Sequence, residues 1–276
     1  MTDSEKRIRL REILTGQKGA IAPGVTDALF ARLAQDCGYD AVHLSGNAIH
    51  KNCCLRDRNL LSVTQIAQRV GQISEATDIP LIVDAGPACI DPLALARSVK
   101  HFERAGAAAI RFEDTLVNEY GASPDDLAIA PVSQMTDRIK TALDARVDRS
   151  LVLIFRCDSR PKEPLSQVQE RLGAYVKAGA DAVGVQLSDI GDFRQVGANP
   201  PAPLVTLWPK TEMRATDFFQ LGFKIALTPS SVPLAALAAA KEMLLELGEK
   251  GTERDYFSRQ KESRAIEKWY RDLGRE

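Results

Sequence analysis

Three short apolar runs of the sequence end in residues that can bind anions or cations. Asp84 ends the run LIVD, Glu113 follows AAIRF, and Arg156 follows LVLIF. Carboxylates are hard oxygen ligands that suit Mg²⁺ or Mn²⁺, and Asp57 adds a third carboxylate from a preceding loop. An arginine fork binds a carboxylate or phosphoryl group through two parallel hydrogen bonds. These residue types predict a metal-assisted site for a small anionic substrate.

A single aspartate at such a position is more often a helix N-cap or one half of a loop ion pair. Three such residues at the ends of three successive runs favour a functional site instead, provided that the runs are strands whose ends meet. Other polar residues also stand at or just beyond the ends of predicted strands. They are Ser45, Asp114, Asp158, Gln186, Ser188, Asp189, Trp208, Lys210 and Thr228.

The elements that would position these residues alternate along the whole chain. Short β-branched or apolar runs are separated by amphipathic segments with apolar residues at helical spacing. The predicted strands lie within 18–24, 37–46, 77–86, 105–114, 148–158, 178–189, 201–208 and 221–229. Eight such pairs in about 250 residues favour a (β/α)8 barrel, with a doubly wound open sheet as the alternative. We predict one barrel domain over residues 1–276, in which 250–276 is a helical C-terminal extension.

Glycines and a proline mark the predicted helix ends. Gly38, Gly106, Gly179 and Gly222 follow helical segments, where a left-handed residue commonly ends a helix. Asp91 is predicted to be the N-cap of a helix with Pro92 in its first turn.

Composition excludes several classes of function. The chain has 36 basic and 37 acidic residues, and this balance argues against nucleic-acid binding. No apolar run approaches the roughly 18 residues that a membrane span needs, so no membrane partner is expected. Five cysteines without a CxxC pair indicate free thiols in a reducing cytoplasm. We expect Cys53 and Cys54 to be buried, and His50 to lie in a solvated loop.

Several motifs together resemble the isocitrate lyase/phosphoenolpyruvate mutase superfamily. They are PGVTDALFARLAQDCGYDAVHLSGNAI, LRDRNLLSVTQI, IPLIVDA, FERAGAAAIRFED and LIFRCDSR, within residues 8–245. The resemblance implies a barrel whose eighth helix is exchanged between neighbouring subunits of a homo-oligomer, a dimer or tetramer. It also implies Mg²⁺ and small 2-oxo or 2-hydroxy acid substrates that react through an enolate.

The resemblance assigns a role to each matching residue. Ser45, Gly46 and Asn47 correspond to the stretch that holds the substrate's carboxylate and keto oxygen. Asp84 corresponds to the direct metal ligand, while Asp57 and Glu113 hold the ion through water. Arg156 corresponds to the arginine that binds the substrate's carboxylate or phosphonate.

Two departures from the family pattern bear on the chemistry. Gly86 stands where the family usually has a second carboxylate, so the metal is expected to bind weakly or to be absent. The lyases carry a Lys-Lys-Cys-Gly-His loop after the residue that matches Glu113, and this chain reads EDTLVNEYGASPDD instead. In that loop Asn118 is a candidate for a polar contact with substrate.

The sequence therefore predicts a lyase that cleaves a C–C bond of, or decarboxylates, an oxaloacetate-like acid through a stabilised enolate. Decarboxylation starts with little acid catalysis, so a loop without cysteine is compatible with it. The alternatives are a phosphonopyruvate mutase or hydrolase acting on a P–C bond, and a catalytically inactive barrel that binds a metabolite.

Overall fold

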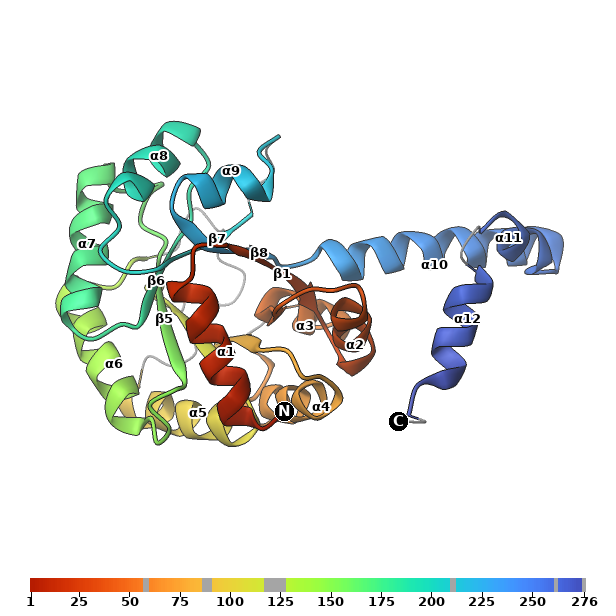
Figure 1. Cartoon of the computed structure of the whole chain (residues 1–276), viewed down its shortest axis with the longest axis horizontal. Helices are drawn as coiled ribbons and strands as arrows, with labels where there is room; N and C mark the ends of the chain where they lie inside the picture. Colours follow the sequence, from red (N-terminus) through yellow and green to blue (C-terminus); the bar gives the residue numbers. More distant parts are fainter. Residues whose placement is uncertain (57–59, 86–90, 117–127, 209–211, 261–262, 275–276) are drawn as a thin grey trace. The chain divides into compact units, whose positions relative to one another are not determined.

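The computed structural model describes residues 1–56, 60–85, 91–116, 128–208, 212–260 and 263–274. Eight parallel strands close into a barrel in chain order, with β1 paired to β8 (Figure 1). The strands are β1 Ala20–Val25, β2 Val42–Leu44, β3 Leu81–Asp84, β4 Ala109–Glu113, β5 Val152–Cys157, β6 Ala182–Val185, β7 Leu204–Leu207 and β8 Phe223–Thr228. The predicted (β/α)8 barrel is confirmed, since the pairing of β1 with β8 leaves no open sheet edge.

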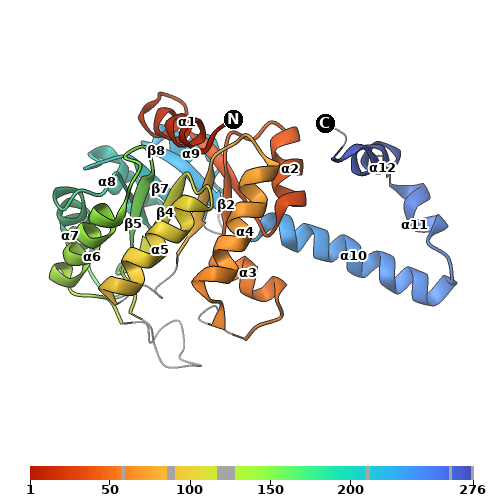
Figure 2. The same ribbon diagram turned by 90° about the horizontal axis from the view of Figure 1, so that it is seen from below.

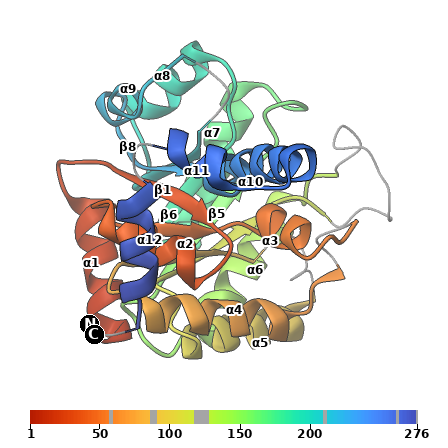
Figure 3. The ribbon, with the colours of Figure 1, turned by 90° about the vertical axis from the view of Figure 1, so that its right-hand side faces the viewer.

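Helices connect the strands and surround them. Figures 2 and 3 show α4 beside α5, and this order continues around the barrel through α6 and α7. The helices of this layer and its connections are α2 Ala28–Asp36, α3 Gly46–Asn52, α4 Val63–Ala76, α5 Pro92–Arg104, α6 Val132–Ala145, α7 Leu165–Lys177, α8 Ile190–Ala198 and α9 Ala215–Gln220. Their apolar faces and the outward side chains of the strands form the larger of two buried clusters.

The predicted helix boundaries are confirmed by backbone geometry. Each of the four glycines at predicted helix ends has a positive φ: Gly38, Gly106, Gly179 and Gly222. Asp91 caps α5 by accepting a hydrogen bond from the Ala94 amide at 2.9 Å, and Pro92 occupies the first turn. Cys53 and Cys54 do not follow the prediction, because α3 ends before them and both side chains are exposed. Cys54 itself has φ 53°, which places it in a turn beyond the helix.

The interior of the barrel is the smaller buried cluster. It contains inward side chains such as Ile82, Ala109 and Ile154, and α1 (Asp3–Thr15) adds Leu10 and Leu14. Since α1 packs against β5 and β8, the amino end of the barrel is filled with apolar side chains. Along each strand, side chains that point into the barrel alternate with side chains that point out of it. The next inward residues toward the carboxyl end are therefore the ionisable ones.

The chain divides into two compact units, Met1–Ser231 and Val232–Glu276. The barrel strands lie in the first. The second contains most of α10 (Ser231–Lys250), together with α11 (Arg254–Arg259) and α12 (Ser263–Asp272), so the predicted C-terminal extension is helical. Within it the Tyr256 hydroxyl donates to the Ala239 carbonyl at 3.2 Å. Among the described residues, none of the helices combines the length and apolarity that crossing a bilayer requires.

Candidate active site

The carboxyl ends of β3 and β4 bring together a buried ion pair. Arg111 Nη2 lies 2.7 Å from Asp84 Oδ2, and the two side chains are only 2% and 4% exposed. Asp84 and Arg111 are directly paired positions in the β3–β4 register, so the sheet itself sets their separation. The Nε and Nη1 atoms of Arg111 are buried and have no hydrogen-bond partner. The predicted metal ligand is thus already held by a guanidinium.

Arg156 forms the second centre of positive charge. It is paired with Glu113 in the β4–β5 register, and its Nη2 lies 3.2 Å from Glu113 Oε1. The same Nη2 donates to Asp158 Oδ2. Glu113 Oε2 also accepts from the Thr115 hydroxyl at 3.1 Å. The structure therefore places Glu113 and Arg156 together as predicted, with Asp158 as an additional carboxylate.

A glycine makes room for Arg156 inside the barrel. Gly184 of β6 is its directly paired position, and a Cβ at Gly184 would lie 3.0 Å from both Cβ and Cγ of Arg156. Such a contact is tighter than side chains normally accept. A larger residue at position 184 would therefore displace the arginine, which makes Gly184 part of the site's construction.

Burial controls the ionisation of this cluster. Burial, opposed by Arg156, raises the pKa of Asp158 to about 6. Burial also opposes the charge of Arg156, but Asp158 and Glu113 more than compensate, so the pKa of Arg156 is raised. Burial and the nearby Arg111 lower the pKa of His43 to about 3, so this histidine is neutral. The cluster can thus present two cations and a carboxylate that gains a proton in mildly acidic solution.

The turn from β2 into α3 lies against Asp84. Ser45 is buried at the N-cap of α3, and a Cβ at Gly46 would lie 3.8 Å from Asp84 Oδ2. The Ser45–Gly46 stretch therefore borders the ion pair, whereas the side chain of Asn47 is exposed, and the predicted role of this stretch in substrate binding stays a prediction. His50 is buried rather than solvated, because its Nδ1 lies 3.1 Å from the Gly46 carbonyl one helical turn back.

Two predicted site residues, Asp57 and Asn118, lie outside the described residues, as does Gly86. The fit of a divalent ion can be judged on the other two predicted ligands, Asp84 and Glu113. Each of these carboxylates already pairs with an arginine. In the part of the chain that the structure describes, no group of three or more His, Cys, Asp or Glu side chains is arranged to hold a metal. By themselves, the described residues do not fit Mg²⁺ or Mn²⁺.

Neighbouring residues hold the β5 end in position from outside the barrel. Asp114 accepts from the Asp158 amide and from the Tyr175 hydroxyl of α7, each at 2.8 Å. Burial raises the pKa of Asp114. Trp208, at the end of β7, packs edge to face on Phe218 of α9, with the ring centroids 5.6 Å apart. We interpret Asp114 and Tyr175 as supports for the loop that carries Asp158.

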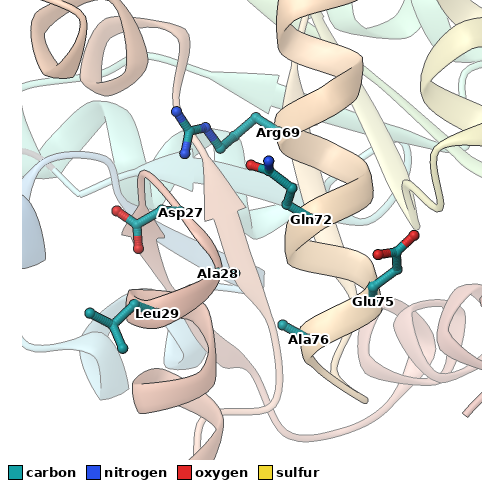
Figure 4. Close-up of a pocket in the computed structure, with 7 residues that line it drawn as sticks. All are labelled: Asp27, Ala28, Leu29, Arg69, Gln72, Glu75 and Ala76. Carbon is teal, nitrogen blue, oxygen red and sulfur yellow. The ribbon is translucent and has the colours of Figure 1, made fainter. Parts of the chain in front are cut away.

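A surface pocket between α2 and α4 is separate from this cluster (Figure 4). Arg69 and Gln72 of α4 lie on the side of that helix that faces the start of α2, and Glu75 and Ala76 also line the pocket. Asp27 also lines it, but its carboxylate caps α2 by accepting from the Phe30 amide at 3.0 Å. None of the predicted site residues lines this pocket.

Sequence reasoning missed Arg111 and gave no role to Asp158. The signal for Arg111 was present, because it lies two residues before Glu113 and strand residues at that spacing share a face. The pairing of Arg111 with Asp84 could not be seen, since it depends on the register between two strands. Likewise, Asp158 follows Arg156 by two residues, on the same inward face.

A closed (β/α)8 barrel with ionisable residues at the carboxyl ends of its strands has the architecture of a barrel enzyme, whose active site lies at that end. The model of the phosphoenolpyruvate phosphomutase family matches residues 10–247. The chain therefore belongs to this family, within the isocitrate lyase/phosphoenolpyruvate mutase superfamily.

Curated relatives and a solved structure agree with this family. A 2-methylisocitrate lyase of Aeropyrum pernix is 33% identical over 251 residues, covering 89% of this chain and 81% of its own. A 2,3-dimethylmalate lyase of Eubacterium barkeri is 29% identical, with coverages of 87% and 83%. A phosphonopyruvate hydrolase in complex with oxalate and Mg²⁺ superimposes with a TM-score of 0.83 at 23% identity, covering 100% of this chain and 99% of its own, and shows the common fold. The two curated relatives, both lyases, support an enzyme of the C–C lyase type.

Proposed function

We propose that this protein is a lyase that cleaves a C–C bond of a small 2-oxo or 2-hydroxy acid, or decarboxylates it, and releases an enolate. The observation that carries the proposal is the cluster of Arg111 and Arg156 with buried carboxylates inside the barrel. Among the described residues, buried polar atoms of this cluster have no partner in the protein: Arg111 Nε and Nη1, Arg156 Nε, and Asp158 Oδ1. Buried donors without partners are costly unless a ligand engages them.

Arg156 is the proposed anchor of the substrate carboxylate. Its guanidinium is buried, fixed by Glu113 and Asp158, and kept charged. A buried cation held in place before the substrate binds needs no reorganisation when negative charge develops during the reaction. Ser45, at the start of α3, is the proposed partner of the substrate's keto oxygen.

The proposed chemistry leaves a pair of electrons on the substrate when its C–C bond breaks. When a 2-oxo acid loses a carboxylate as CO2, the pair is delocalised onto the oxygen of the 2-oxo group as an enolate, which a proton from solvent or an acid then quenches. In a 2-hydroxy acid a base takes the hydroxyl proton and the C–O⁻ becomes the C=O of the 2-oxo product. The pair then stays on the other fragment, where it is delocalised onto that fragment's carboxylate until a proton quenches it. The cationic side chains of the cluster favour this charge. The names of the curated relatives, both lyases, support C–C cleavage over P–C cleavage.

The experiment is a substrate panel followed by proton and phosphorus NMR. The compounds are oxaloacetate, 2,3-dimethylmalate, 2-methylisocitrate and phosphonopyruvate. Release of pyruvate or another 2-oxo product from one of the carbon acids is the expected result, and its absence in Arg156→Ala would tie turnover to the cluster. Turnover of phosphonopyruvate alone would replace the proposal with a P–C enzyme. Binding without turnover of any compound would favour an inactive metabolite-binding barrel.

We also propose that the chain forms a homo-oligomer, a dimer or tetramer, through exchange of α10. The support is a set of leucines on α10 that are 37–65% exposed: Leu234, Leu237, Leu244, Leu245 and Leu247. A helix that leaves several leucines in water is expected to be covered by a partner. Light scattering on the eluted protein should give the mass of a multimer, and Leu237→Glu with Leu244→Glu should lower it. Lys241→Glu, on the same helix, is the control that should leave the mass unchanged.

The proposed location is the cytoplasm. Cys37, Cys53 and Cys54 are exposed free thiols, which persist in a reducing compartment. A thiol reagent that does not cross the cell membrane tests the location. It should label these cysteines in lysed cells and leave them unlabelled in intact cells.

A further inference from the structure

We propose that Arg111 takes the place of a divalent cation in this site: its guanidinium is the counter-charge of Asp84, and the protein works without a bound metal. The inference deepens the proposed function and rests on it for the identity of the reaction. Its structural basis, the buried Arg111–Asp84 pair, stands independently of which substrate is used.

The geometry of the pair leaves little freedom for a competing cation. Arg111 Nη2 lies 2.7 Å from Asp84 Oδ2, inside the barrel, and both side chains are almost completely buried. The two residues are opposite each other in the β3–β4 register, so neither is carried on a loop that could move aside. A divalent ion bound to Asp84 would have to displace this guanidinium or sit beside it. Separating a buried ion pair leaves a charge without a partner, which is strongly unfavourable.

The charges around Asp84 also disfavour the binding of a divalent cation. Among the described residues, the cations facing this region are Arg111 and Arg156, and the charge of Arg156 disfavours that of Arg111. The carboxylates are Asp84, Glu113 and Asp158, and two of them pair directly with Arg156. His43 is neutral and adds no charge. Among the described residues of this region, the two arginines offset two of the three carboxylate charges, which lowers the attraction for a doubly charged ion.

The sequence supplies an independent observation. Residue 86, two positions after Asp84, is glycine and offers no ligand where a further carboxylate would strengthen cation binding. A glycine at position 86 and an arginine beside Asp84 act in the same direction, since each lowers the affinity for Mg²⁺. Arg111 also differs from a metal in what it offers the substrate. It presents fixed N–H donors, and two of its nitrogens, Nε and Nη1, have no partner among the described residues.

The test is a Mn²⁺ titration read by electron paramagnetic resonance, in which bound ion loses the signal of the free ion. The wild type, Arg111→Gln, Arg111→Lys and the double variant Arg111→Gln with Asp84→Asn are compared, without and with oxalate. The wild type is expected to bind no Mn²⁺ up to about 1 mM, the weak end of the range for carboxylate sites in proteins. Arg111→Gln is expected to bind at least about tenfold more tightly, because a neighbouring cation has been removed. Arg111→Lys keeps the charge and should behave as the wild type.

The double variant shows where the ion binds. Loss of the gained affinity in Arg111→Gln with Asp84→Asn would place the ion at Asp84. Binding of Mn²⁺ by the wild type, with or without oxalate, that Arg111→Gln leaves unchanged or weakens would overturn the proposal. If Arg111→Gln does not fold, the wild type and Arg111→Lys decide the matter alone, since tight binding by either one contradicts the proposal. No turnover is measured, so a failure of the lyase assignment does not alter the outcome.

Discussion

At the amino end of the barrel, each side-chain nitrogen of Arg7 and each carboxylate oxygen of Asp148 has a hydrogen-bond partner. Arg7 of α1 donates to the Ala107 and Glu103 carbonyls at 3.0 and 2.6 Å, and its Nη1 lies 2.7 Å from Asp148 Oδ2. Asp148 also accepts from the amide and hydroxyl of Ser150 at 2.8 and 2.6 Å. The Ser150 hydroxyl is the main reason why the pKa of Asp148 is held below its usual range.

At the carboxyl end the same residue types are arranged differently. Arg111 and Arg156 keep donors without partners among the described residues, and Asp158 keeps an unpartnered oxygen. Burial raises the pKa of Asp158 to about 6, whereas Asp148 at the other end has a lowered one. Satisfied pairs with stabilised charges indicate a structural role, and unsatisfied pairs with destabilised charges indicate a site that awaits a ligand. The two ends should therefore respond to mutation in different ways.

The largest effect is expected from Arg156→Ala. It should lower kcat/KM by about 10³-fold, the loss expected when a buried group that stabilises developing charge is removed. The matched control is Arg160→Ala, which removes a partly exposed arginine that lies in the loop that follows β5 and pairs with Asp192. Steady-state kinetics on the substrate found by the NMR panel measure both. Equal losses in the two variants would contradict the assignment of the anion-binding role to Arg156.

Arg7→Ala tests the opposite end. It should lower the free energy of unfolding by about 2–3 kcal/mol, less than a fully buried pair because Asp148 is 27% exposed. Urea denaturation measures the loss, and kcat of the folded protein should stay within about twofold, since the site lies at the other end of the strands. A kcat that falls as far as in Arg156→Ala would show that the ends are not separable.

The pH dependence of turnover should depend on Asp158. Only the ionised carboxylate forms an ion pair with Arg156 and holds it in position, so kcat/KM should rise as pH increases through about 6. Asp158→Asn should remove this rise and lower kcat/KM at neutral pH by about tenfold, a typical value for a charge-assisted contact. Asp192→Asn is the control that should keep the rise. Persistence of the rise in Asp158→Asn would assign it to another group.

The smallest effect is expected from Ser150→Ala, which removes the hydroxyl donor to Asp148. The loss in unfolding free energy should be about 1 kcal/mol at pH 7, the usual size for one hydrogen bond. The lowered pKa of Asp148 stabilises the fold above the pKa of the unfolded carboxyl, about 3.9, and this contribution is lost as the pH falls below it. The difference between wild type and variant should therefore shrink in acid. Thr141→Ala, which removes a hydroxyl on the surface of α6, should show no such trend.

Local patterns of the sequence were sufficient to predict most of the fold. Glycines such as Gly106 and Gly179 mark helix ends because few other residues adopt positive φ there. Alternation of apolar runs with amphipathic segments gave the eight strands and their order. The predicted exposure of His50 and the predicted burial of Cys53 and Cys54 were wrong, because burial in and just after α3 depends on which side of this short helix faces the barrel. Residue type alone does not determine that.

The candidate site was predictable in part. Asp84, Glu113 and Arg156 could be named because each follows an apolar run, and the structure confirms that they lie at strand ends. Which carboxylate pairs with which arginine could not be predicted, because that depends on the register between neighbouring strands. The metal at Asp84 was predicted from the carboxylates and the family resemblance, and it stays a prediction; the structure pairs Asp84 with Arg111. The roles of Asp57 and Asn118 stay predictions.

The measurement that tests the central claim most directly is calorimetric binding of oxalate, a dianion with the two adjacent oxygen-bearing carbons of a 2-oxo acid enolate. The claim is that the carboxyl end of the barrel binds a carboxylate through Arg156. Binding by the wild type and by Arg160→Ala, with affinity reduced at least about tenfold in Arg156→Ala, is the predicted result. Equal binding of oxalate by all three proteins, or by none of them, would contradict the account.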